Sequence, residues 1–145
     1  MDADTDLAEV ADRLRLGIGL VVRRLRQLNA AGDLTLPESA ALGRLERGGP
    51  ATASELARQE QISPQSMGAT LAALESRGLL RRDADPADGR RVVLSPTPAG
   101  LAALRDRRNA RTQRIAAALE VGFTPTEIAT LRAAAPLFER LAERL

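Results

Sequence analysis

The segment from residue 52 to residue 95 constrains the fold more than any other part of the chain. It opens with TASE at 52–55, a capping box in which a threonine and a glutamate three residues later satisfy backbone N–H groups at a helix start. This short helix should end at about Glu60. Ser63 and Pro64 then mark a second helix start, with Ser63 as N-cap and Pro64 at the first helical position.

The apolar spacing of the second helix supports this interpretation. Met67, Leu71 and Leu74 follow one another at i, i+4 and i+7, so they should face a common core. We expect Ile62 to be buried in the turn between the helices, and Gly78 to end the second helix. Two helices joined by a turn of three or four residues, with this inward spacing, predict a helix-turn-helix.

A hairpin is predicted directly after this motif. Residues 79–83 and 91–95 are short extended runs, and DPADGR at 85–90 between them is typical of a tight turn. The hairpin would have a charged tip. Its base carries Arg81 and Arg82, and its return carries Arg90 and Arg91.

A helix-turn-helix followed by such a wing is an arrangement that reads DNA. The second helix enters the major groove and its N-terminal residues reach the base edges. Gln65 could bind adenine through two hydrogen bonds, and the helix N-terminus offers backbone N–H groups to a phosphate. An arginine of the wing would enter the flanking minor groove. The candidate residues of the second helix are Ser63, Gln65, Ser66, Gly68, Ala69 and Thr70.

Long helices are predicted on both sides of this segment. Residues 7–30 carry an apolar seam at alternating four- and three-residue steps. This seam favours a contact with another subunit; the alternative is packing within the chain alone. A capping box at 35–38 starts the next helix, and glycine and proline at 48–50 end it. After the hairpin, helices should run from Thr97 to about Glu120 and from a third capping box at 124–127 to the C-terminus.

Five arginines crowd the middle of the helix that follows the hairpin. They favour a solvated helix face over a DNA or ligand site, and they could also pair with the acidic N-terminal segment of a second subunit. They are Arg105, Arg107, Arg108, Arg111 and Arg114.

Composition excludes several classes of function. The chain has no cysteine and no histidine, so disulfides, thiol redox sensing and the usual zinc ligands are absent. It also lacks lysine, tyrosine and a glycine-rich phosphate loop, which argues against an enzyme and against a cofactor.

The formal net charge is only +2, so local charge placement is better evidence of a nucleic-acid partner than overall charge. Without an apolar run of about 18 residues or a signal peptide, we expect a cytoplasmic protein with no membrane partner.

Two runs resemble the MarR family of winged-helix transcription regulators. DPADGRRVVLS at 85–95, followed by Gly100, is similar to the wing signature of that family, and LESRGL at 74–79 is similar to the end of its recognition helix. The resemblance covers the whole chain in the order of its elements. It implies a mainly α fold with a small β-hairpin wing (α+β), in which a winged helix-turn-helix is flanked by long dimerisation helices.

The resemblance also implies roles and partners. The expected boundaries are an N-terminal dimerisation helix at 1–33, a DNA-binding lobe at 34–96 and C-terminal dimerisation helices at 97–145. The expected function is that of a homodimeric repressor on a pseudo-palindromic DNA operator, released by a small aromatic or phenolic effector. Arg90 would be the minor-groove contact at the wing tip, and Asp88 the acidic partner that orients it.

The chain departs from the common family pattern in its recognition helix. Many members carry arginine or lysine early in that helix, whereas no charged residue lies between Glu60 and Glu75 here. A protein-interaction module that no longer reads DNA is therefore the alternative function. The attraction to phosphates would come from other positions, for which the candidates are Arg58, Arg77, Arg81, Arg82, Arg90 and Arg91.

Overall fold

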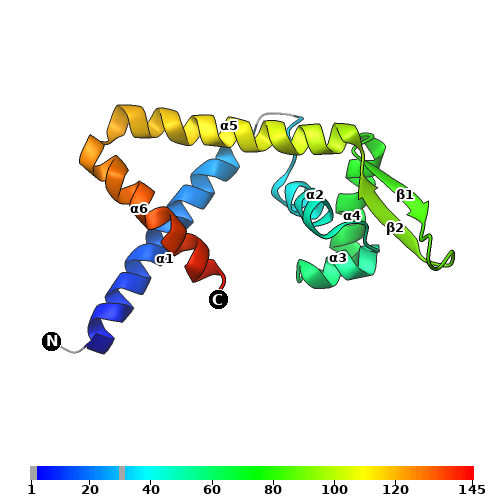
Figure 1. The fold of residues 1–145 in the computed structure, drawn as a ribbon, viewed down its shortest axis with the longest axis horizontal. Helices are drawn as coiled ribbons and strands as arrows, with labels where there is room; N and C mark the ends of the chain where they lie inside the picture. The colour runs from blue at the N-terminus through cyan, green and yellow to red at the C-terminus, as the bar shows by residue number, and fades with distance from the viewer. Residues whose placement is uncertain (1–2, 30–31) are drawn as a thin grey trace. The chain divides into compact units, whose positions relative to one another are not determined.

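The computed structural model describes residues 3–29 and 32–145, which form six helices and one two-stranded antiparallel sheet (Figure 1). The expected mainly α class with a small hairpin is confirmed. The chain divides into two compact units, residues 1–107 and 108–145. The elements are α1 (Ala3–Gln27), α2 (Leu36–Gly48), α3 (Ala53–Gln59), α4 (Pro64–Ser76), β1 (Leu80–Ala84), β2 (Val92–Pro96), α5 (Pro98–Gly122) and α6 (Pro125–Ala142).

Local start signals place the helices as the sequence predicted. Capping boxes are present at the starts of α2, α3 and α6, where the threonine N–H donates to the glutamate Oε2 at 2.8–2.9 Å. Ser63 caps α4 and its Oγ accepts from the N–H of Ser66 at 3.1 Å. The predicted 7–30 helix differs at both ends, because α1 begins at Ala3 and ends at Gln27, before Leu28 and Asn29; residue 30 lies outside the described residues.

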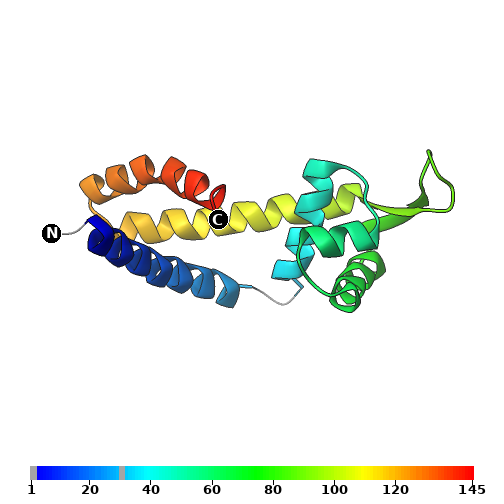
Figure 2. The same cartoon turned by 90° about the horizontal axis from the view of Figure 1, so that it is seen from below.

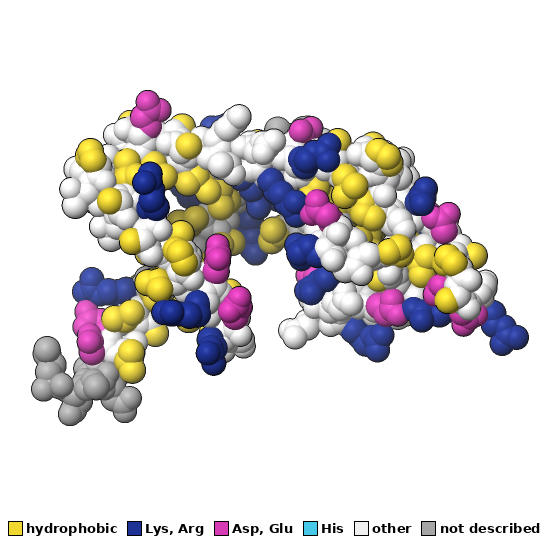
Figure 3. All heavy atoms as spheres, viewed as in Figure 1, with side chains coloured by type: hydrophobic (Ala, Val, Ile, Leu, Met, Phe, Trp, Pro, Cys, Tyr) yellow, Lys and Arg dark blue, Asp and Glu magenta, His cyan; other side chains and the backbone are white. Residues whose placement is uncertain are grey.

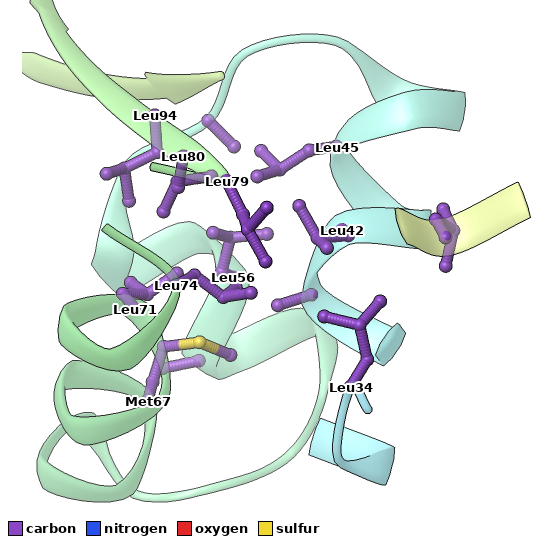
Figure 4. Close-up of a cluster of buried hydrophobic side chains, with 14 residues drawn as sticks. Leu34, Leu42, Leu45, Leu56, Met67, Leu71, Leu74, Leu79, Leu80 and Leu94 are labelled. Atoms are coloured by element: carbon purple, nitrogen blue, oxygen red, sulfur yellow. The ribbon is translucent and has the colours of Figure 1, made fainter. Parts of the chain in front are cut away.

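One apolar core joins α2, α3, α4, the hairpin and the first part of α5 into a winged lobe (Figure 4). The labelled side chains of α2, α3, α4 and the hairpin point toward one another, and Met67, Leu71 and Leu74 are almost fully buried, as predicted. Burying a leucine of this kind contributes about 1.5–3 kcal/mol. One face of α4 packs in this core, and its opposite face is exposed.

The prediction that Ile62 is buried is wrong. The residue is 37% exposed. The turn between α3 and α4 is closed by backbone hydrogen bonds instead, since the Ile62 N–H donates to the Ala57 carbonyl at 3.1 Å. Gln61 adopts a positive φ of 54°, which turns the chain before α4 without a buried apolar residue.

The hairpin extends away from the lobe helices in both ribbon views (Figure 1, Figure 2). Its antiparallel register pairs Leu80 with Pro96 at the base and Ala84 with Val92 near the tip. A separate β-bridge joins Ala51, just before α3, to Leu94 of β2, with N···O distances of 3.3 and 2.8 Å. This bridge fastens the base of the wing to the helix-turn-helix.

The beginning of α5 packs closely on the lobe. Gly100, Leu104 and Arg107 are buried and lie on one helix face at i, i+4 and i+7. A Cβ added to Gly100 would stand 2.0 Å from the carbonyl oxygen of Leu79, so only glycine fits there without movement. The expected solvated arginine face is wrong at Arg107, which is 8% exposed because it falls on this buried face.

The remaining helices expose many large apolar side chains. In α1 these include Leu7, Leu20 and Val21, and in residues 108–145 they include Val121, Leu137 and Phe138. No described helix is long and apolar enough to cross a membrane. Each of these two parts therefore presents apolar surface that the described fold does not cover.

Candidate nucleic-acid interface

The exposed face of α4 carries most of the residues expected to read DNA. Gln65, Ser66 and Ala69 are exposed, and Gly68 and Thr70 are half-buried. No charged side chain interrupts this face between the start of the helix and Glu75. Its surface is therefore neutral, and most of its side chains are small.

The hydroxyl groups near the start of α4 are engaged locally. The Ser63 hydroxyl donates to Ser66 Oγ at 2.9 Å, and the Thr70 hydroxyl donates to the Ser66 carbonyl at 3.1 Å. Gln65, by contrast, makes no hydrogen bond with any described residue. Its amide can both donate and accept, which is the capacity needed at the edge of a base.

The wing turn is built by aspartates that bind its backbone. Asp85 Oδ1 accepts from the N–H of Ala87 at 2.9 Å, and Asp88 Oδ1 accepts from the N–H of Arg90 at 3.1 Å. Asp88 thus holds the backbone of Arg90, the wing arginine that the resemblance implied it orients. The Arg90 side chain is exposed and pairs with no described residue, so it is available to an external anion.

Arg91 is held by carboxylates of the lobe. Its guanidinium pairs with Glu55 of α3, and its Nε lies 3.7 Å from Asp85 Oδ2. Glu55 has two functions, because its other oxygen accepts from the N–H of Thr52 in the capping box. The Thr52 backbone hydrogen bond and the Arg91 guanidinium lower the pKa of Glu55 below its usual value. The pair fastens the return strand of the wing to α3.

Other lobe arginines are also paired with carboxylates. Arg82 Nε lies 2.8 Å from Glu75 Oε2 and so ties β1 to the end of α4. Arg77 Nη1 lies 3.1 Å from Glu38 Oε2 and ties the end of α4 to the start of α2. Arg81 pairs with Asp83 within β1 at 2.9 Å. Of the six arginines proposed for phosphates, four are therefore engaged with carboxylates in the described structure.

Two of the proposed phosphate arginines remain without a described partner. Arg58 is exposed on α3, and Arg90 is exposed on the wing. Figure 3 shows basic side chains at the end of the hairpin, with acidic and basic side chains next to one another over the nearby lobe surface. Cationic attraction is thus concentrated at a few positions around a neutral α4.

The sequence did not predict the ion pairs made by Glu55 and Glu75 or the close contact at Gly100. The capping-box pattern accounts for Glu55 as part of a helix start. Its ion pair with Arg91, 36 residues away, leaves no signal in the local sequence. Among the described residues, no group of three or more Asp or Glu side chains could hold a metal ion. What the arrangement offers chemically is a neutral helix face, a helix N-terminus and two free guanidinium groups.

The comparisons with known proteins agree with this geometry. The model of the MarR family matches residues 33–91, which include the helix-turn-helix and most of the wing. An HTH-type transcriptional regulator of Mycobacterium bovis is 32% identical over 97% of this chain and 96% of its own length. The chain belongs to the MarR family of transcriptional regulators. Family and relatives are DNA-binding regulators and not enzymes.

Solved structures share the fold over nearly the whole chain. A Pseudomonas aeruginosa transcriptional regulator is 32% identical, covers 98% of both chains and superposes with a TM-score of 0.82. The Bordetella bronchiseptica protein BpsR is 22% identical and covers 92% of this chain and 98% of its own, with a TM-score of 0.60; its DNA binding is regulated by 6-hydroxynicotinic acid. The second likeness concerns the fold alone.

Proposed function

We propose that this MarR-family regulator is a homodimeric repressor that binds a pseudo-palindromic operator. The observation that carries the proposal is the exposed, uncharged face of α4 beside a wing whose Arg90 side chain is free. In this proposal α4 lies in the major groove and Arg90 enters the adjacent minor groove. Ser63 and the first N–H groups of α4 bind a phosphate. Because its partner is DNA, the protein acts in the cytoplasm.

Dimerisation is supported by the uncovered apolar side chains of α1 and of residues 108–145. Monomers rarely leave contiguous apolar patches of more than a few hundred Å² in water. We assign residues 1–33 and 97–145 to the dimer and residues 34–96 to DNA binding. The first turns of α5 serve both parts, because Gly100 and Leu104 pack in the lobe. Two subunits would place their half-sites about 10–10.5 bp apart or a multiple of that.

Release by a small aromatic or phenolic effector is the further part of the proposal. Its support is analogy, since the DNA binding of BpsR, which shares the fold, is regulated by 6-hydroxynicotinic acid. An effector would act by binding the DNA-free conformation more tightly than the operator-bound one. A screen of aromatic carboxylates and phenols against the protein–operator complex tests this part by itself.

The alternative is a protein-interaction module whose neutral α4 no longer reads DNA. The two functions differ in their dependence on salt. A regulator that neutralises phosphates loses affinity steeply as salt rises, with a log–log slope of about −0.9 per phosphate contact. A module that does not bind DNA would show weak affinity for every duplex at every salt concentration.

The deciding experiment is fluorescence anisotropy of the full chain on duplexes that tile its upstream region, across a salt series. We expect tight binding to one duplex and a steep salt slope. Arg90→Ala should weaken binding to all duplexes and reduce the slope by roughly one unit per subunit. Arg105→Ala is the matched control, because Arg105 is also exposed and unpaired among the described residues but lies on α5. Equal effects of the two variants would refute the wing contact.

A further inference from the structure

Among the polar side chains of α4, one makes no hydrogen bond within the described structure. Ser63 and Ser66 bond each other, and the hydroxyls of Thr70 and Ser76 donate to carbonyls of their own helix. Among the described residues of α4, Gln65 is the polar side chain that makes no such bond. Gln65 is therefore the α4 side chain with all of its donor and acceptor groups open to a base edge in each half-site.

The exposed α4 face also has no arginine available to bind a base. The guanidiniums beside this helix are bound to carboxylates: Arg82 to Glu75 at 2.8 Å and Arg77 to Glu38 at 3.1 Å. Bidentate arginine is the commonest reader of guanine in the major groove. Arg58 is free but lies on α3, the helix that crosses the DNA backbone in this kind of motif. The commonest means of specifying a G·C pair is thus missing from α4.

Gly68 is not required by the fold. It lies inside α4 with an ordinary helical φ, and a Cβ added there would meet no atom within 4 Å. Glycine in a helix interior is less favourable than alanine, so the residue lowers stability without an intramolecular reason. A surface that must approach another molecule closely does supply a reason. Next to Gly68, the exposed side chains of Ala69 and Ala72 offer only methyl groups.

We infer that the α4 face reads a half-site of A·T pairs through close contact with thymine 5-methyl groups, with Gln65 binding one adenine. The inference rests on the proposed DNA binding and specifies which base pairs are read. The C5-methyl group distinguishes thymine in the major groove, and alanine methyls are suitable partners for it. Glutamine pairs with adenine N6 and N7 through two hydrogen bonds. Gly68 permits the approach at which these methyl contacts form.

The test begins with selection of bound duplexes from a randomised library by the purified full chain. We expect a half-site core of A·T pairs. Each core thymine is then replaced by deoxyuridine, which removes only the methyl group and keeps the base pairing. Affinity should fall about fourfold for each contacted thymine, the effect of withdrawing one buried methyl-sized group. The same replacement in the spacer between half-sites should have no effect.

Two protein variants complete the test. Gly68→Ala should raise the urea midpoint of unfolding yet weaken operator binding, a combination that a merely structural glycine does not produce. Gly48→Ala is the matched control, because Gly48 is also helical with open space around its Cβ but lies at the end of α2. Gln65→Ala should remove the preference at one base pair of each half-site, by roughly 5- to 150-fold.

The outcomes separate the inference from the function on which it rests. Selection of no duplex would overturn both. A selected core of G·C pairs, deoxyuridine without effect at every thymine, or unchanged operator affinity in Gly68→Ala would overturn the inference while leaving DNA binding intact.

Discussion

Replacement of Gly100 by alanine is a sharp test of how α5 is joined to the DNA-binding lobe. The new Cβ would lie 2.0 Å from the Leu79 carbonyl oxygen, 3.0 Å from its carbonyl carbon and 3.3 Å from its Cα. All three atoms belong to the backbone, so no side-chain rotation relieves the contact. The helix and the turn after α4 must move apart by roughly 1.5 Å to restore an ordinary separation.

The cost follows from what this movement disturbs. The Leu79 carbonyl accepts the Thr97 N–H at 3.1 Å, a bond at the start of α5 whose loss costs about 1 kcal/mol. Overpacking of a close contact adds about 1–3 kcal/mol. Alanine returns about 1 kcal/mol through its higher helix propensity. The net expectation is a loss of about 1–3 kcal/mol in the free energy of unfolding.

Urea unfolding followed by circular dichroism measures this loss. All variants are compared at one protein concentration, because the proposed dimerisation would make stability depend on concentration. Gly68→Ala is the internal control of opposite sign, since its Cβ would meet open space and should add about 0.5–1 kcal/mol. If Gly100→Ala were as stable as the parent protein, the close approach of α5 to Leu79 would be refuted.

Three other predictions concern the wing, the caps and the core. Arg91→Ala and Glu55→Gln should each weaken operator binding, and in a double-mutant cycle their effects should be less than additive, because one ion pair is removed by either change. Hydrogen bonds from the capping threonines lower the pKa of Glu55 and that of Glu127 in the folded chain. The stability that each carboxylate contributes is therefore fully present above pH 4.5, the unfolded value, and is lost as the pH falls through the lowered folded pKa. Urea midpoints between pH 6 and pH 3 should therefore fall less steeply for Glu127→Gln. Leu104→Ala, at a side chain only 2% exposed, should cost about 2–5 kcal/mol of unfolding free energy by the same urea assay.

Local rules explain why most elements could be predicted from sequence. A capping box involves residues three positions apart, so Thr35 with Glu38, or Thr52 with Glu55, signals a helix start without any knowledge of the tertiary fold. The inward spacing of Met67 is likewise a property of one helix. Repeated signals of this kind, together with the turn chemistry of the wing, placed the helices and the hairpin in the observed order.

The errors and omissions arise where distant parts of the chain meet. Ile62 appeared apolar enough for burial, but the backbone geometry around Gln61 closes the turn and leaves its side chain partly in water. The charge of the arginine cluster predicts a solvated face, but it does not reveal that Arg107 lies on the same buried helix face as Gly100. The partner of Arg91 could not be chosen among many acidic residues without the approach of the wing to α3.

The distribution of arginine in the lobe connects its stability with its reading of DNA. A buried or half-buried carboxylate such as Glu38 needs a partner, and Arg77 supplies it at 3.1 Å. Each guanidinium in such an ion pair joins two elements and is not free to bind a DNA phosphate. In the proposed mode of binding, attraction depends on the few free cations, above all Arg90 at the wing, whereas discrimination depends on Gln65 and on the shape and methyl groups of α4. Substitution at Arg90 should therefore change affinity for all sequences, and substitution at Gly68 should change the choice among them.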